Sequence, residues 1–251
     1  MHGRRLMALT MVTGITALGL LGCGGDGDKE ASDQPFAGKS ADRIAADAVK
    51  ATRQADSMHV KGTTQQKTGG QVTVDLTVDQ RKNCEGTVKM AGTTADVRHL
   101  DGTLYLRGDE KYWKATLKQQ PGAAKLVPKL KDKWVKTPAD DSMTQGMCDK
   151  QGLVASMDED KSERQGMKKS GTTSVNGTKA LRLTKKTSGG ETLSLYVAAE
   201  GKPYILRTTS SGGKNPNSAT FGDYGKAVRP QEPSPDDTVD LKELASAAQR
   251  T

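Results

Sequence analysis

The sequence predicts an α+β fold in which two antiparallel meanders of strands are accompanied by separate helices. Stretches of alternating apolar and polar residues are separated by short turn-forming segments, and helical patterns lie before, between and after them. The apolar content is 33%, and aromatic residues make up 4%. This is low for a chain of 251 residues, and it favours a thin sheet around a hollow or a helix over a densely filled globule.

The first half of the chain predicts one helix followed by a meander. A helix is expected over 40–56, because Ser40 is a good N-cap and small and apolar residues recur after it at helical spacing. Further strands are expected at 86–91, 94–100 and 103–107, the last two joined across a short Asp-Gly turn that favours a hairpin. Before them, residues 71–78 alternate strictly, which places four side chains on one face: Val72, Val74, Leu76 and Val78.

The stretch from Leu117 to Val135 interrupts the strands. Pro121 and Pro128 exclude one long helix, so two short helical pieces with lysine-rich outer faces are expected. Such a basic patch would steer the domain to anionic lipid; the alternative is an ordinary solvated helix face. The lysines concerned are Lys118, Lys125, Lys129, Lys131, Lys133 and Lys136.

The second meander is expected after residue 171, with strands at 180–183, 191–197 and 204–207. In the middle strand Leu193, Leu195 and Val197 share one face. A proline-rich segment then leads to a short C-terminal helix over 240–248, capped by Asp240.

The N-terminus has the pattern of an export signal. Two arginines precede an uncharged, largely apolar run of 16 residues, Leu6 to Leu21, which is shorter than the about 20 residues that span a bilayer. The run ends in Leu20-Leu21-Gly22-Cys23, which matches the lipobox of bacterial lipoproteins. The match implies acylation of the Cys23 sulfur and cleavage before it. The alternative is an ordinary signal peptide followed by a coincidental cysteine.

These features predict the domain organisation and the location. We expect a lipoprotein signal peptide at 1–22, an acylated Cys23 with a flexible tether at 23–39, and a single domain at 40–251. The tether is rich in glycine and acidic residues, which leaves little to bury. Two or three acyl chains would hold the domain on the extracytoplasmic face of the cell membrane.

The charge balance limits the partners. There are 38 Lys and Arg against 30 Asp and Glu, a net charge of +8, and loss of Arg4 and Arg5 with the signal peptide would leave +6. A basic exported domain most simply meets anionic lipid headgroups or anionic wall polymers. Nucleic acid is a poor fit outside the cell, and no recognised nucleic-acid-binding motif is visible.

Motifs for catalysis are missing from the sequence. His59 and His99 lie in polar, strand-like surroundings and are expected to be surface or hydrogen-bonded residues. No nucleophile elbow, phosphate-binding loop or metal-ligand set is visible. We therefore expect no enzyme activity, no metal and no cofactor. After Cys23, only Cys84 and Cys148 remain, which predicts one disulfide in an oxidising compartment, with two free thiols as the alternative.

Several segments together resemble the actinobacterial LppX/LprG lipoproteins, which are relatives of the LolA carriers. They are the lipobox, the helix after the tether, the segments 101–109 and 221–228, and the proline-rich end with Val239-Asp240-Leu241. The resemblance implies an antiparallel half-barrel, a curved sheet of two meanders closed by helices, and several members of the family shelter lipid chains in its hollow.

The resemblance also implies candidate ligand-binding residues. Residues on one face of the expected strands at 71–78, 103–107 and 191–197 would line the hollow, with two tryptophans as candidates for its mouth; for each residue the alternative is plain core. We expect the protein to hold or pass a lipid or glycolipid, or alternatively to be a non-catalytic envelope-stress or signalling accessory that binds a membrane protein. The candidates are Val72, Val74, Leu76, Val78, Leu104, Leu106, Trp113, Trp134, Leu193, Leu195 and Val197.

Overall fold

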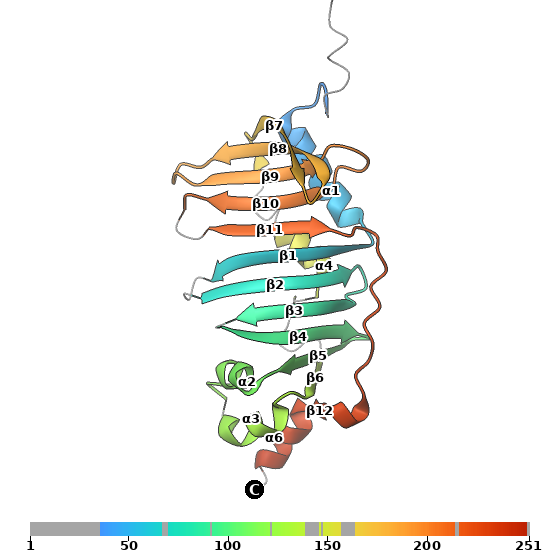
Figure 1. Cartoon of the computed structure of the whole chain (residues 1–251), viewed down its shortest axis with the longest axis vertical. Helices are drawn as coiled ribbons and strands as arrows, with labels where there is room; N and C mark the ends of the chain where they lie inside the picture. Colours follow the sequence, from blue (N-terminus) through green and yellow to red (C-terminus); the bar gives the residue numbers. More distant parts are fainter. Residues whose placement is uncertain are drawn as a thin grey trace, which may run out of the picture. The chain divides into compact units, whose positions relative to one another are not determined.

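All strands of the described chain belong to one sheet. The computed structural model describes residues 36–66, 70–90, 92–120, 122–138, 146, 148–156, 164–213 and 216–249. Within them, twelve strands form an open sheet in the order β12-β6-β5-β4-β3-β2-β1-β11-β10-β9-β8-β7 (Figure 1). The expected signal peptide, Cys23 and tether residues 24–35 lie outside the described residues.

The first meander runs outward from β1 in the middle of the sheet. The expected strands of this half are confirmed, and the hairpin between β4 and β5 turns at Asp101 and Gly102, which both have positive φ, 48° and 73°. Such a pair is typical of a two-residue hairpin turn, because it matches the twist of the strands. The strands are β1 (Ser57–Gln66), β2 (Gly70–Asp79), β3 (Cys84–Met90), β4 (Thr93–Leu100), β5 (Thr103–Gly108) and β6 (Trp134–Pro138).

The second meander returns to the first. Its last strand pairs antiparallel with β1, from His59 opposite Gly222 to Thr63 opposite Ser218. This pairing joins the two meanders into one curved sheet, and the expected α+β fold is confirmed. The strands are β7 (Lys168–Val175), β8 (Thr178–Lys186), β9 (Thr192–Ala198), β10 (Ile205–Ser211) and β11 (Asn217–Gly222).

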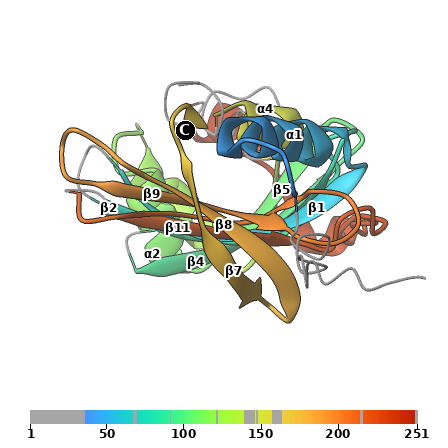
Figure 2. The same cartoon turned by 90° about the horizontal axis from the view of Figure 1, so that it is seen from above.

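Two helices lie over one face of the sheet, which we call the inner face (Figure 2). They are α1 (Ala41–Gln54) and α4 (Lys150–Ser156). The N-cap expected at Ser40 is confirmed, since its hydroxyl accepts a hydrogen bond from the Arg43 amide at 3.2 Å. The buried stripe of α1 comprises Ala41, Ile44, Ala45, Ala48, Val49 and Thr52, and it packs against the sheet over β9 and β10.

The remaining helices gather at the β12 end of the sheet (Figure 1). They are α2 (Glu110–Thr116), α3 (Ala123–Leu130) and α6 (Leu241–Gln249), the last of which begins after the expected cap at Asp240. The expectation of two helical pieces within 117–135 is partly wrong. Only α3 lies there: α2 begins earlier, because Asp109 accepts the Tyr112 amide at 2.7 Å, and Trp134 begins strand β6.

The strand register separates the two faces of the sheet. Leu76, Gly86, Val97 and Leu106 follow one another across β2 to β5 and lie on the inner face. The neighbouring row on the opposite face, which we call the outer face, is polar. It crosses the same strands through Asp75, Thr87, Asp96 and Arg107.

A C-terminal strap, residues 223–234, connects β11 to the far end of the sheet (Figure 1). Ser57 donates a hydrogen bond to the Lys226 carbonyl at 2.5 Å, and Tyr105 donates one to the Glu232 carboxylate at 2.9 Å. Burial, together with this carboxylate, raises the pKa of Tyr105 to about 12. The strap ends in a short 3-10 helix, Pro235–Asp237, and β12 (Thr238–Asp240), which pairs parallel with β6.

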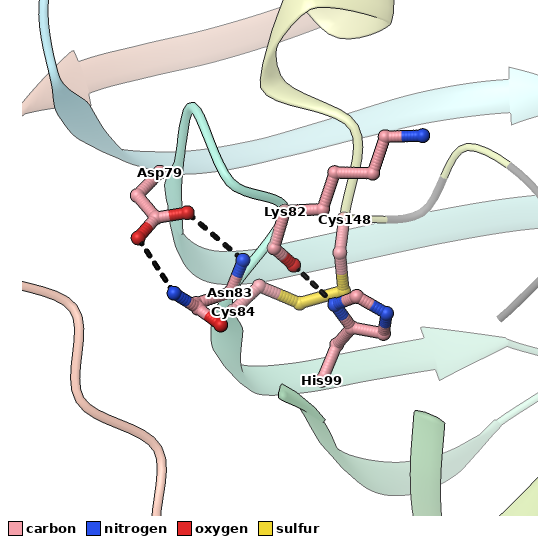
Figure 3. Close-up of a disulfide and its surroundings, with 6 residues drawn as sticks. All are labelled: Asp79, Lys82, Asn83, Cys84, His99 and Cys148. Atoms are coloured by element: carbon pink, nitrogen blue, oxygen red, sulfur yellow. Dashed lines mark hydrogen bonds between the residues drawn. A yellow bond between two sulfur atoms is a disulfide. The ribbon is translucent and has the colours of Figure 1, made fainter. Parts of the chain in front are cut away.

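The expected disulfide is present. Cys84 on β3 is bonded to Cys148, which precedes α4, across a separation of 64 residues (Figure 3). The turn beside it is fixed by Asp79, whose carboxylate accepts the Asn83 amide at 2.9 Å. On the other side the buried ring of His99 donates its Nδ1–H to the Lys82 carbonyl, since a carbonyl can only accept. The disulfide therefore ties α4 to a rigid part of the sheet.

Replacing both cysteines by alanine should lower the free energy of unfolding by about 2–5 kcal/mol, because the open chain gains conformational entropy in the unfolded state. Urea denaturation of the double variant against the oxidised parent measures this. A double variant as stable as the parent would show that the bridge does not stabilise the fold.

Candidate functional site

A hollow of about 290 Å³ lies on the inner face, between α1 and strands β9 to β11. Its apolar side is formed by Val49 of α1, Met167 and three residues of the sheet, Leu193, Leu195 and Ile205. Leu195 and Ile205 are buried, whereas Leu193 is half-buried. The hollow therefore lies where the helix meets the apolar face of the second meander.

The other side of the hollow is polar. Thr208 and Ser210 of β10 face inward beside Leu195 and Leu193, and Asn217 of β11 pairs with Ser210. The Ser210 hydroxyl donates a hydrogen bond to the Glu191 carboxylate. Arg164, Ser194 and Thr209 also line the hollow. Acidic, basic, hydroxyl and amide side chains thus stand next to the aliphatic wall, so the hollow is amphipathic.

One irregularity in β10 holds α1 in place. The register of β10 against β9 shifts between Ile205 and Arg207, which is typical of a β-bulge. The Ile205 amide donates instead to the buried Thr52 hydroxyl of α1 at 3.0 Å, and the Ile205 carbonyl accepts the Tyr224 hydroxyl. Burial raises the pKa of Tyr224, whose ring stacks on Tyr204 at 4.1 Å. Both backbone groups of Ile205 are therefore paired with side chains.

Small side chains continue the inner face beyond the hollow. Thr208 pairs with Ala219 of β11, which pairs with Gly62 of β1, which pairs with Val74 of β2. A Cβ at Gly62 would meet the Ala219 Cβ at 2.9 Å, so this position requires glycine. Val74 and Ala219 are half-buried. The inner face at the junction of the two meanders is therefore apolar and carries small side chains.

The structure divides the expected lining residues into groups. Leu193 and Leu195 line the hollow, and Val72 and Val74 are half-buried on the same face. Trp113 is 2% exposed and packs edge-on against Tyr112 within α2. The others on the inner face are buried in the core: Leu76, Val78, Leu104, Leu106 and Val197.

Trp134, a candidate for the mouth of the hollow, lies on the other side of the sheet. It pairs with Arg107 across β5 and β6, so it lies on the outer face, where it borders a second, polar hollow of about 440 Å³. The guanidinium groups of Arg98 and Arg107 lie 4.5 and 4.7 Å from its ring centre. Arg107 also holds Asp96 at 2.7 Å. The tryptophan is therefore separated from the apolar hollow by the sheet itself.

The two histidines are hydrogen-bonded, as expected. His59 Nε2 lies 2.6 Å from Asp75 on the outer face, and His99 is buried beside the disulfide. Lys61 lies 2.8 Å from the same carboxylate. Its hydrogen bond is the largest of the effects that hold the pKa of Asp75 below its usual range, and His59 acts in the same direction.

Among the described residues, no group of three or more His, Cys, Asp or Glu side chains is placed to hold a metal ion. In the same part of the chain, no helix combines the length and the apolar character that crossing a bilayer requires.

The polar residues of the inner hollow were not expected from the sequence. Thr208, Ser210 and Asn217 lie in polar stretches, so their pattern carried no signal for an inward face. Glu191 begins an expected strand, and nothing in its sequence pattern indicates a ligand-binding role. What identifies them is the pairing of β10 with β9 and β11, which joins residues that are distant in sequence.

Comparisons with known proteins identify the fold. No protein-family model matches the sequence, and no curated protein matches it. The structure is similar to that of LprF from Mycobacterium bovis, with a TM-score of 0.52 and 16% identity over 77% of this chain and 97% of LprF. The Mycobacterium tuberculosis lipoprotein LppX aligns with a TM-score of 0.48 and 12% identity over 75% of this chain and 96% of LppX. At the level of the fold, the expected resemblance to LppX/LprG lipoproteins is confirmed.

Changing Thr52 to valine should lower the free energy of unfolding by about 1–3 kcal/mol, because the buried Ile205 amide would lose its acceptor while the shape of the side chain is kept. Chemical denaturation monitored by tryptophan fluorescence measures the loss. The matched control is Thr87→Val on the outer face, where a change within about 0.5 kcal/mol is expected. Equal effects of both substitutions would contradict the link between α1 and β10.

Proposed function

We propose that the protein is a lipoprotein, anchored through Cys23 on the extracytoplasmic face of the cell membrane, that binds an amphiphile in the inner hollow. The observation that carries this proposal is the amphipathic lining of the hollow, with leucines on one side and Glu191, Ser210 and Asn217 on the other. The family to which the sequence is similar includes members that shelter lipid chains, which supports the proposal.

Binding would be driven by desolvation of an acyl chain. Each Å² of apolar surface that leaves water gains about 25 cal/mol, and the chain would lie against Leu193, Leu195 and Ile205 beneath Val49. Ligand pockets usually measure about 300–1,000 Å³, so a hollow of about 290 Å³ favours one acyl chain over a lipid with several.

The polar side selects the headgroup. The Glu191 carboxylate can only accept hydrogen bonds, and the Arg164 guanidinium of the same hollow can only donate them. The Asn217 amide and the Thr208 hydroxyl can both donate and accept. Hydroxyl groups of a sugar match this set, because each hydroxyl donates to one partner and accepts from another. We therefore propose a glycolipid or another hydroxylated amphiphile as the ligand, held without chemical change.

Filling the hollow should abolish binding. Thr208→Phe places a large ring between the helix and β11, and we expect at least a tenfold lower fraction of lipid-bound protein. Native mass spectrometry of the protein purified from its own host measures this fraction. Phenylalanine is well tolerated in strands, so we expect the variant to stay folded.

The matched control is Thr87→Phe, the same substitution on the outer face of β3, which should leave the lipid-bound fraction unchanged. If the unaltered protein carries no lipid and co-purifies with a stable protein partner, the proposal is overturned in favour of an accessory that binds a membrane protein.

The anchor is tested separately. Cys23→Ser should prevent incorporation of radiolabelled palmitate and release the protein from the membrane fraction, because no other site would carry acyl chains. Ser32→Ala, in the expected tether, is the control and should label and fractionate like the parent. Palmitate in the Cys23→Ser protein, or unchanged attachment, would refute the proposed anchor.

A further inference from the structure

Positive charge is concentrated in one segment of the chain, which lies at the β12 end of the sheet. Residues 109–136 contain eight lysines and three acidic residues, which leaves a net charge of +5, against +8 for the whole chain. This segment comprises α2, α3 and the start of β6. Roughly a ninth of the sequence therefore carries more than half of its net charge.

The helices turn these lysines outward. In and just after α2, Lys111, Lys114 and Lys118 recur at a spacing of three and four residues, while Tyr112, Trp113 and Leu117 form the buried side. In α3, Lys125 and Lys129 are exposed one turn apart. Further exposed lysines follow at 131 and 136. We call these seven exposed lysines the lysine-rich end.

The charged residues of 235–249 at the same end, which are mainly acidic, reduce the net charge from +5 to +2, but several of the lysines have no ion-pair partner in the described part of the chain. Lys114 pairs with Glu110 at 2.6 Å, and the half-buried Lys133 pairs with Asp237 at 3.2 Å. For Lys118, Lys125 and Lys129, no ion pair exists within the described residues. Lys114 lowers the pKa of Glu110, and Lys131 acts in the same direction, so a lysine of α2 and the lysine that follows α3 both lie near one carboxylate.

The lysine-rich end lies at the opposite edge of the sheet from Phe36, the first described residue. The Phe36 carbonyl accepts a hydrogen bond from Lys169 of β7 at 3.1 Å, and β7 is the opposite edge strand from β12. With a strand spacing of about 4.8 Å, the two edges of a twelve-stranded sheet are separated by about 50 Å along the sheet. The described chain therefore begins at the β7 edge of the sheet, and the lysine-rich end lies at the β12 edge.

We propose that the lysine-rich end binds the anionic phospholipid headgroups of a bilayer, as a second attachment in addition to the N-terminal anchor. The lysines are spread over two adjacent helices and the residues that follow each of them, and neither hollow described above includes any of them. A groove would suit a linear polymer, whereas an open cationic surface suits a planar array of phosphates. Leu126, Val127 and Leu130 are buried, so contact is electrostatic and does not require insertion.

Hydrogen exchange of the full chain tests this at the lysine-rich end itself. With vesicles of phosphatidylcholine and phosphatidylglycerol (7:3), amides of 110–131 should exchange at least about twofold more slowly than with pure phosphatidylcholine. The protection should disappear in 1 M salt, where the screening length falls to about 3 Å. It should also disappear in the triple variant K118Q/K125Q/K129Q.

The matched control is K50Q/K179Q/K202Q, which removes three exposed lysines elsewhere and should keep the protection. The proposal is overturned if the amides of 110–131 exchange at the same rate with both kinds of vesicle. It is also overturned if both triple variants lose the protection to the same extent. The proposal rests on the proposed membrane location but not on the hollow. A protein without bound lipid, or without acylation at Cys23, would leave the exchange result unchanged.

Discussion

The pairing of β1 with β11 is the constraint on which the rest of the structure depends. Each meander is built from local hairpins, but His59 to Thr63 pair with residues about 160 positions later. Closing so long a loop costs conformational entropy, and only the interactions of the completed long-range pairing offset this cost. Once it forms, the inner faces of both meanders become one continuous surface. Gly62 and Ala219 meet at this junction, and their small size allows the strands to approach without obstructing the inner face.

A sheet of this width is too wide for α1 to cover. With 14 residues, α1 is about 21 Å long, less than half of the about 50 Å from edge to edge. It therefore packs on β9 and β10, and the disulfide places α4 nearby by joining Cys148 to β3. The chain has few aromatic residues to fill what remains. The hollow results from this mismatch between a wide sheet and a short helix. The low apolar content of the sequence is the feature that predicts the hollow.

The sequence predicted most of the strands in which one face is apolar and the other polar. Val72 to Val78 alternate without interruption, and the positive φ of Asp101 and Gly102 suits their expected turn. Strand β7 was missed because its residues are exposed up to Val175, although the Asn176-Gly177 pair that follows is a strong hairpin signal. Strand β6 was missed because lysines at helical spacing continue past the end of α3. Packing against β5 and β12, rather than the local pattern, makes 134–138 a strand.

The polarity of the hollow depends on the bulge in β10, and for that reason it could not be predicted. Regular alternation from the inward Ile205 would turn Arg207 and Thr209 toward the helix. Because the register shifts after Ile205, Thr208 and Ser210 face inward and Arg207 faces outward, opposite Tyr196. The same irregularity frees the Ile205 amide for Thr52. A single extra residue thus keeps the Arg207 guanidinium on the outer face, turns two hydroxyls into the hollow, which Arg164 also lines, and fixes the helix that covers it.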